Sequence, residues 1–306
     1  MPRRMEPFAG VPIGQIGGGD DDVLLDPGPI ACRGDKIALF DYGDMKLKSF
    51  DLKGKLRWAL GRKGSGPGEY VNPTDLKVDT RGNIVLRDPP NGRILLFDPM
   101  GSLVRSVQVT SHNHQALPLA GGRYLLIGAT STAFAVMIDS MGSTMRSIPL
   151  TKQQIATSPI SRQTVVGQAE DGGAVVGFLF GSGFMLVKPD GTMRSMPGIE
   201  ALPFPRAVTL KIGPKKQYTA TRIDPAAPKG SYSATMDDER AFFLFGGRSR
   251  HGGAIMDVYR RATGAYEVSY TLPEGTTSVT ACERSLLLLS LDPLPTLTIY
   301  KTPVRR

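Results

Sequence analysis

The sequence has few of the residues from which metal and nucleophile sites are most often built. It holds three histidines, His112, His114 and His251, and two cysteines, Cys32 and Cys282. It contains no Ser/His/Asp grouping, G-x-S-x-G elbow or H-E-x-x-H motif. Two cysteines also fall short of the several-bridge framework of a small secreted domain. The motif-defined hydrolases and zinc peptidases are therefore excluded.

Long apolar runs are missing as well. No stretch approaches the roughly 20 apolar residues of a membrane span. Residues 1–6 carry charge, but the apolar region of a signal peptide does not follow them. We therefore expect a soluble chain, either cytoplasmic or extracytoplasmic after removal of a signal. The sequence leaves that choice open, and we expect a monomer.

The positive charge is not concentrated. The chain has 37 Lys and Arg against 28 Asp and Glu, a net charge of +9, but the basic residues are interleaved with acids. Only Lys215 and Lys216, with Lys211 and Arg222 nearby, form a local cluster. A nucleic-acid-binding surface needs a denser basic stripe, so the sequence does not favour that partner.

Glycine and proline, by contrast, are abundant and evenly spread. The 36 glycines and 24 prolines fit a chain with many short strands and many turns. The clearest unit covers residues 76–109, where four strand-like runs alternate with turns as a four-stranded meander. Its last turn recurs along the chain, ending in Gly54, Gly101, Gly142, Gly191 and Gly264. All intervals except the last match the ~40–50 residues of a propeller blade.

Six continuous apolar runs mark the middle of six such units. They cover residues 37–40, 84–86, 124–127, 174–178, 241–245 and 286–289. Because they do not alternate with polar residues, both faces of these strands are expected to be covered, as between packed blades. The sequence predicts one all-β domain over residues 1–306, a six-bladed β-propeller of four-stranded antiparallel blades. The blades cover approximately residues 28–60, 72–109, 114–150, 162–197, 230–273 and 276–303.

The two ends of the chain predict how the ring closes. The last unit has three strands and lacks its outermost one, whereas residues 11–17 form a strand without a blade of its own. We expect this N-terminal strand to complete the last blade and so to remove an exposed edge.

Residues 61–70, with the motifs that follow them up to Phe97 and Asp98, resemble the NHL-type repeat and bacterial six-bladed propeller proteins. The resemblance covers residues 28–108 well and implies the fold. It does not imply an activity, because the fold carries enzymes, sensors and binding modules. The similar amidating lyase uses several histidines for zinc, and lactonase-like relatives use acidic and amide ligands for calcium. Asp41, Asp88 and Asn91 are of suitable types, but the full ligand set is not matched, so neither activity is carried over.

Strand order places one group of polar residues at a common mouth. Connections between second and third strands, and those between blades, emerge on one face, the top face. The candidate ligand-binding residues there are Asp41, Tyr42, Arg87, Asp88, Asn91, His112, His114, Arg248, Arg250 and His251. The three histidines could hold zinc or could be solvated loop residues. We predict no cofactor, with a divalent cation as the alternative.

A basic insertion separates blades four and five. Residues 199–230 predict a β-hairpin that carries Lys215, Lys216 and Arg222. It either pads the blade edge or forms a cationic lid that favours an anionic ligand. The glycines at 64, 66 and 68 are interpreted as a turn between blades, because no helix follows them.

Cys32 and Cys282 occupy matching positions on the innermost strands of the first and last blades. We expect equivalent positions on adjacent blades to be too far apart for the ~4.4–6.8 Å Cα separation of a disulfide. The sequence therefore predicts free buried thiols.

Two functions follow from these features. The first is a binding module that uses the top face for a protein, peptide or anionic glycan. The alternative is a hydrolase or lyase at the channel mouth, with Asp41 and Asp88 as its acidic residues.

Overall fold

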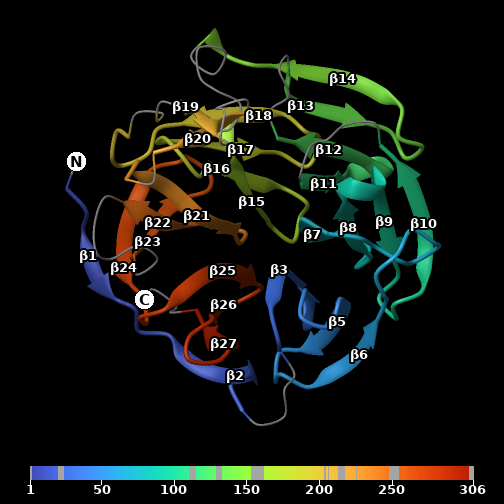
Figure 1. Cartoon of the computed structure of the whole chain (residues 1–306). Coiled ribbons are helices and arrows are strands. Elements are labelled where there is room, and N and C mark those ends of the chain that lie inside the picture. Colours follow the sequence, from blue (N-terminus) through green and yellow to red (C-terminus); the bar gives the residue numbers. More distant parts are fainter. Residues whose placement is uncertain are drawn as a thin grey trace.

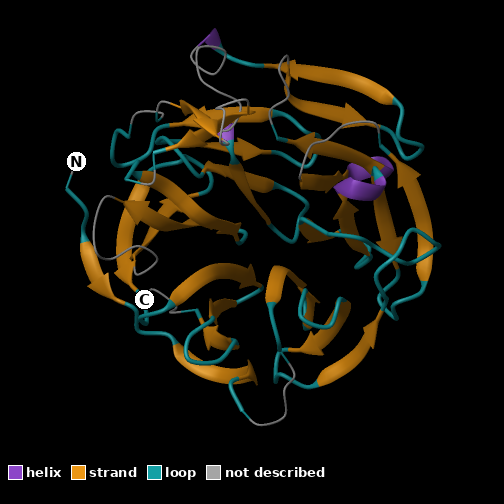
Figure 2. Ribbon diagram, viewed as in Figure 1, coloured by secondary structure: helices purple, strands orange, loops and turns teal. Residues whose placement is uncertain are grey.

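Six antiparallel sheets stand around a common axis in the computed structural model (Figures 1 and 2). The structure describes residues 2–19, 24–109, 115–128, 133–152, 162–202, 205, 207–212, 218–224, 226–247 and 255–302. Blades one to five each contain a four-stranded meander, an N-terminal strand completes blade six, and the predicted six-bladed propeller is confirmed. No helix in these ranges is long and apolar enough to cross a membrane.

The strands follow one another from the axis outward in each blade. Blade one contains β3 (Pro27–Arg33), β4 (Lys36–Asp41), β5 (Lys46–Asp51) and β6 (Leu56–Leu60). Blade two contains β7 (Asp75–Val78), β8 (Ile84–Asp88), β9 (Arg93–Phe97) and β10 (Leu103–Gln108). Blade three contains β11 (Gln115–Leu119), β12 (Arg123–Ile127), β13 (Ala133–Ile138) and β14 (Thr144–Pro149). Short 3₁₀ turns, η1 (Pro89–Asn91) and η2 (Ala120–Gly122), follow β8 and β11.

The second half repeats this order with additions. Blade four contains β15 (Thr164–Gln168), β16 (Ala174–Phe178), β17 (Phe184–Val187) and β18 (Met193–Met196). A separate hairpin of β19 (Ala207–Ile212) and β20 (Tyr218–Ile223) comes next. Blade five contains β21 (Lys229–Met236), β22 (Arg240–Gly247), β23 (Ile255–Arg260) and β24 (Tyr266–Thr271). Blade six contains β25 (Thr276–Cys282), β26 (Ser285–Ser290) and β27 (Thr296–Lys301).

Blade-on-blade packing explains the apolar runs. Every residue of β8 is buried, as is all of β4 except its first residue. Phe40 of blade one and Leu86 of blade two belong to the same core cluster. A middle strand therefore buries both faces, one against each neighbouring blade, which is why the runs lack alternation.

The recurrent last turn has one geometry in successive blades. In blade two, one carboxylate oxygen of Asp98 accepts hydrogen bonds from the backbone amides of Met100 and Ser102, each at 2.9 Å. Gly101 has a φ of 90°, which favours glycine because it has no Cβ. Asp51 and Asp139 make the corresponding backbone contacts in blades one and three.

The N-terminal arm, residues 2–17, closes the ring, as predicted. Strand β2 (Val11–Gly17) pairs antiparallel with β27 and supplies the outermost strand of blade six. Ile16 is 2% exposed and packs with Leu39 and Leu297 in a core cluster shared by blades one and six. The pairing thus removes an open sheet edge and also contributes to the core. A second N-terminal strand, β1 (Met5–Pro7), was not predicted and pairs with β24 on the outside of blade five (Figure 1).

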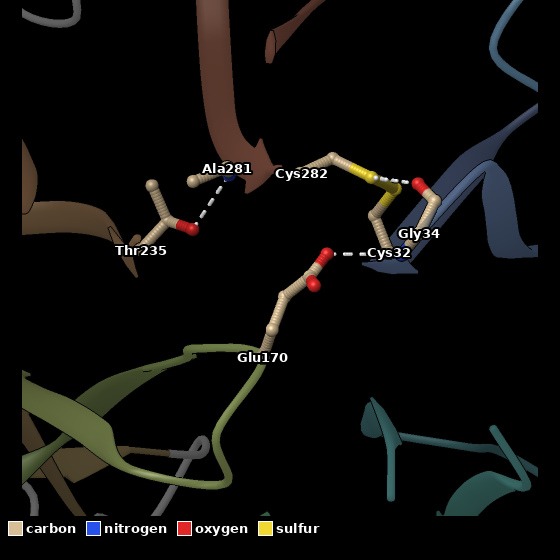
Figure 3. The surroundings of a disulfide bond; sticks show 6 residues. All are labelled: Cys32, Gly34, Glu170, Thr235, Ala281 and Cys282. Carbon is tan, nitrogen blue, oxygen red and sulfur yellow. Dashed lines mark hydrogen bonds between the residues drawn. A yellow bond between two sulfur atoms is a disulfide. The ribbon is translucent and has the colours of Figure 1, made fainter. Parts of the chain in front are cut away.

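The prediction of free thiols is wrong, because Cys32 and Cys282 form a disulfide between blades one and six. Their Cα atoms are 5.3 Å apart, within the range that a disulfide allows. Both residues lie on innermost strands, and neighbouring innermost strands approach each other closely because the blades taper toward the axis. Figure 3 shows Glu170 beside this bond, where its Oε1 accepts a hydrogen bond of 2.9 Å from the amide of Gly34.

Replacement of both cysteines by serine should lower the free energy of unfolding by about 2–5 kcal/mol, because the bridge closes a loop of most of the chain. Urea denaturation of the two proteins measures this difference. A reducing agent should shift the midpoint of the wild-type protein alone, with the C32S/C282S variant as the control. Equal midpoints for oxidised and reduced wild-type protein would show that the bridge does not constrain the ring.

Candidate ligand site between blades four and five

Asp41, a predicted top-face carboxylate, ties a loop to its blade. It is fully buried at the end of β4 and accepts backbone hydrogen bonds from Leu25 at 2.9 Å and Asp26 at 2.8 Å. Its Oδ2 also lies 2.7 Å from the ammonium of Lys48. Burial alone raises the pKa of this carboxyl, but the bonds from Lys48 and the backbone amides outweigh it and place the pKa below the ordinary value. Asp41 is therefore held as a buried, ionised anchor.

Asp88 has the same role in blade two. It is fully buried at the end of β8, where the backbone amides of Val71 and Asn72 donate to it, the latter at 3.1 Å. Asn91 donates to its Oδ2 at 2.7 Å and to the carbonyl of Gly64 at 3.0 Å. The carboxylate of Asp88 thus fixes the segment that enters blade two.

Among the other predicted residues, those that the structure describes have separate partners. The buried Arg87 donates to the carbonyl of Arg93 at 2.8 Å, and the hydroxyl of Tyr42 donates to the carbonyl of Pro73. Arg222 is exposed on β20. The other predicted residues lie outside the described residues and stay predictions: His112, His114, Lys215, Lys216, Arg248, Arg250 and His251.

A pocket that is partly open to solvent lies instead between blades four and five. The β16–β17 connection, the segment after β18 and the first residues of β21 line it, so it opens among the top-face connections. Its aromatic wall contains Phe184, Phe243 and Tyr259, whose ring centroids lie 4.7–5.5 Å apart. Gly183, with a φ of 84°, lies beside these rings in the lining.

Arg3 of the N-terminal arm reaches into this cavity. Its Nε and Nη2 each donate to a different carboxylate oxygen of Asp257 at 3.0 Å, and its Nη1 donates to Glu200 at 2.7 Å. The guanidinium carbon lies 3.7 Å from the ring centroid of Phe245, a cation–π distance. Burial lowers the pKa of Arg3, but the bonds and charges of Asp257 and Glu200 more than offset it, so the pKa lies above the ordinary value.

The carboxylate that receives Arg3 is almost completely buried. The side chain of Asp257, on β23, is 4% exposed, compared with 40% for Glu200. Ser269 of the neighbouring strand β24 donates to Asp257 Oδ1 at 2.5 Å, and Tyr266 lies 2.8 Å from the Ser269 hydroxyl. A buried charge is costly unless it is paired, so Asp257 is prepared for a cation.

Tyr259 connects the cavity wall to its acidic rim. Its hydroxyl accepts a hydrogen bond of 3.0 Å from the amide of Ile199, the residue before Glu200. Burial, with the charge of Asp257, raises the pKa of Tyr259 above the ordinary value, so the phenol stays neutral. The tyrosine therefore holds the segment that carries Glu200 in place.

Two carboxylates and an aromatic ring thus surround the guanidinium of Arg3. Sequence reasoning missed this arrangement because the charge of residues 1–6 was considered only in the test for a signal peptide, which the sequence does not predict. One signal was available: Asp257 lies between the apolar Met256 and Val258 of a strand, where an acidic residue needs a partner. The partner, 254 residues away in the sequence, could not be identified from that signal.

A second, smaller-mouthed pocket lies on the axis. Innermost strands of five blades line it, with Lys77, Gln168, Thr235 and Thr280 as its polar side chains. The ammonium of Lys77 contacts the carboxylate of Asp75 on its own strand. Within the described residues, no three His, Cys, Asp or Glu side chains are grouped to hold a metal ion.

Replacing Asp41 by asparagine should lower the free energy of unfolding at pH 7 by about 2–4 kcal/mol, because a buried ion pair loses its anion. The pKa of Asp41 is lowered, so its stabilisation is complete above the ordinary value of 3.8 and is lost as the pH falls through the lowered pKa. The two proteins should therefore converge in stability on acidification below about pH 4. Urea titrations between pH 7 and pH 3 measure this.

The D35N variant is the control, because Asp35 forms an ion pair with Arg57 at the surface and is 67% exposed. It should change stability little at any pH. A D41N protein as stable as D35N at neutral pH would contradict the anchoring role of Asp41.

Comparisons with known proteins agree on the fold. The profile of a family described as a 6-bladed beta-propeller matches residues 19–132. No curated protein matches the sequence. A Bacteroides fragilis protein whose name describes it as exported is similar in structure, with a TM-score of 0.63, 11% identity and 99% of each chain covered.

Two further solved structures are similar over nearly the whole chain. A member of the duf4221 family from Bacteroides vulgatus has a TM-score of 0.61 and 10% identity, covering 97% of this chain and 98% of its own. Virginiamycin B lyase from Staphylococcus aureus has a TM-score of 0.54 and 8% identity, covering 94% and 98%. At such identities the likeness extends to the fold alone. The chain is thus a six-bladed β-propeller, and its likeness to the NHL-type repeat stays a prediction.

Proposed function

We propose that this chain is a binding propeller whose cavity between blades four and five receives a cationic side chain of a protein or peptide. The contacts of Arg3 with Asp257 support the proposal. A carboxylate that is 4% exposed accepts two parallel hydrogen bonds from one guanidinium, the geometry that gives arginine recognition its specificity.

The contacts account for both affinity and selectivity. Hydrogen bonds to charged groups contribute about 1.5–3 kcal/mol each, and a cation over an aromatic face adds roughly 0.5–2 kcal/mol. A lysine ammonium cannot reproduce the two parallel bonds to Asp257, so the cavity favours arginine over lysine. Glu200, which is 40% exposed, lies at the entrance and adds a second negative charge.

The charge of the cavity selects among the ligand classes that the sequence suggested. An anionic glycan would face the carboxylates of Asp257 and Glu200, whereas a basic peptide segment would pair with them. Although the net charge of the chain is +9, this site is acidic. A protein or peptide ligand is therefore favoured here over an anionic glycan.

The enzyme alternative has weaker support. It was based on Asp41 and Asp88, and both carboxylates are fully buried and accept hydrogen bonds from backbone amides. The similar fold of virginiamycin B lyase adds nothing specific, because one fold carries many chemistries. Binding is the function that the described residues favour.

The disulfide supports an oxidising location for this binding. Disulfides persist in extracytoplasmic compartments and are rare in reducing cytoplasm. Similarity to a protein whose name describes it as exported agrees with this placement. We therefore extend the proposal to a partner that is met outside the cytoplasm.

In the protein carrying Arg3→Ala, a small guanidinium compound should occupy the site that the Arg3 side chain leaves. Nα-acetyl-arginine amide should raise the melting temperature measurably at millimolar concentration, because it pairs with the buried carboxylate of Asp257, which the substitution leaves without a cation. Nα-acetyl-citrulline amide has nearly the same shape without the charge and should bind at least tenfold more weakly, about 1.4 kcal/mol. Calorimetric titration measures both affinities.

Adding Asp257→Asn to the Arg3→Ala protein provides the matched control and should remove the difference between the two compounds. If arginine and citrulline derivatives bind the Arg3→Ala protein equally, the cavity is not a guanidinium site and the proposed function is wrong.

A further inference from the structure

We infer that the outer edge of blade five is a strand-addition site for an extended partner segment that carries an arginine and, five residues later, an aromatic residue. Residues 2–8, which we term the N-terminal strap, occupy this site within the chain and compete with the partner. This inference rests on the proposed function, because the arginine enters the same cavity. To the proposed function it adds three things: backbone pairing of the ligand with β24, the parallel orientation of the ligand, and a second contact made by its aromatic residue.

The strap is held as an added strand. Strand β1 runs parallel to β24, with Met5 opposite Ser269 and Pro7 opposite Thr271. The amide of Ser269 donates to the carbonyl of Arg4 at 2.9 Å, and the amide of Phe8 donates to the carbonyl of Thr271 at 3.1 Å. Backbone bonds of this kind accept many sequences, so the edge itself selects an extended chain and not a particular side chain.

Two side chains at the ends of the strap give the site its selectivity. Arg3 enters the cavity at one end, as described above. At the other end Phe8 packs edge-on against Tyr270 and Tyr300, with ring centroids 6.2 and 5.2 Å away. Between them, Arg4, Met5 and Pro7 are exposed. A partner thus needs an arginine and an aromatic residue at the same spacing, whereas the side chains between them can vary.

The strap is not required to close the propeller. Blade five already has four strands, and β1 is a fifth. Ring closure depends on β2, which follows the strap and pairs with β27 in blade six. Figure 1 shows β1 and β2 as successive segments on the outside of the ring. The strap can therefore leave blade five while β2 keeps the ring closed.

The backbone pairing of the strap is short, so the strap is attached mainly through Arg3 and Phe8. Only three of its residues pair with β24, and Pro7 has no amide hydrogen to donate. The ion pair between Arg4 and Glu6 lies at the surface, where such pairs contribute little, since Arg4 is 66% exposed. A tethered strap acts at an effective concentration in the millimolar range, which sets the affinity that a partner must exceed.

The test uses the 306-residue chain carrying Arg3→Ala and Phe8→Ala, which keeps the backbone of the strap but removes the two side chains that hold it. A fluorescent peptide with the sequence of residues 2–10 should bind this variant and bind the wild-type protein at least tenfold more weakly, because the intact strap competes. Fluorescence anisotropy measures both affinities.

Two altered peptides separate the contributions. In one, citrulline replaces the arginine that corresponds to Arg3; in the other, the backbone nitrogen that corresponds to Phe8 is methylated, which removes the donor to Thr271. Each change should weaken binding at least tenfold. A peptide of the same composition in reversed order is the control for direction and should not bind measurably.

The outcomes distinguish this inference from the function on which it rests. If the methylated and reversed peptides bind as well as the parent, strand addition is wrong, although the guanidinium site stands. If no peptide binds while acetyl-arginine amide does, the inference is overturned and the cavity proposal remains. If neither binds, both are wrong.

A second variant with a milder substitution keeps the test valid if the double variant does not fold. Arg3→Gln keeps hydrogen-bond donors beside Asp257 and leaves Phe8 in place, so it disturbs the blade less. It should bind the peptide with an affinity between those of the wild-type protein and the double variant. Equal affinity of Arg3→Gln and wild-type protein would contradict competition by the strap.

Discussion

The structure depends on closing the ring. Each blade has middle strands that are apolar on both faces, so each needs a neighbour on either side, and the first and last blades must meet. Strand β2 completes blade six through its pairing with β27, while Ile16 joins the core between blades six and one. The disulfide between Cys32 and Cys282 joins the same two blades close to the axis. Blades one and six are therefore joined both at the outer edge, through β2, and near the axis, through the disulfide.

Because β2 closes the ring, residues 2–8 are not needed for closure and can serve in ligand binding. Because β2 alone supplies the missing strand, the strap that precedes it does not hold the ring and adds to a blade that is already complete. Its Arg3 meets Asp257, a buried carboxylate whose placement inside a strand stabilises the protein only when a cation is present. Stability and recognition thus share one set of contacts, and a partner that supplies the same groups can replace the strap.

The fold was predictable because its signals are local and repeated. Six apolar runs without alternation, and a turn that recurs with Gly in its last position, indicate six blades; the unmatched strand at residues 11–17 indicates how they close. The disulfide was mispredicted because the distance between Cys32 and Cys282 depends on how far the blades taper toward the axis, and no residue pattern encodes that. Asp41 and Asp88 have the composition of ligands, but the backbone amides that bind them are visible only in three dimensions. The site around Arg3 depends on a contact across 254 residues, beyond the reach of local patterns.

Hydrogen exchange followed by mass spectrometry tests most directly the claim that the two parts of the N-terminal arm have separate roles. The account predicts that amides of residues 5–8 exchange through a local opening, much faster than those of residues 11–17 and with little dependence on denaturant. Residues 11–17 should exchange only together with the core strand β26, in the global unfolding of the ring. If residues 5–8 are protected as strongly as residues 11–17, the strap belongs to the closure of the propeller and is not a displaceable occupant of a binding groove.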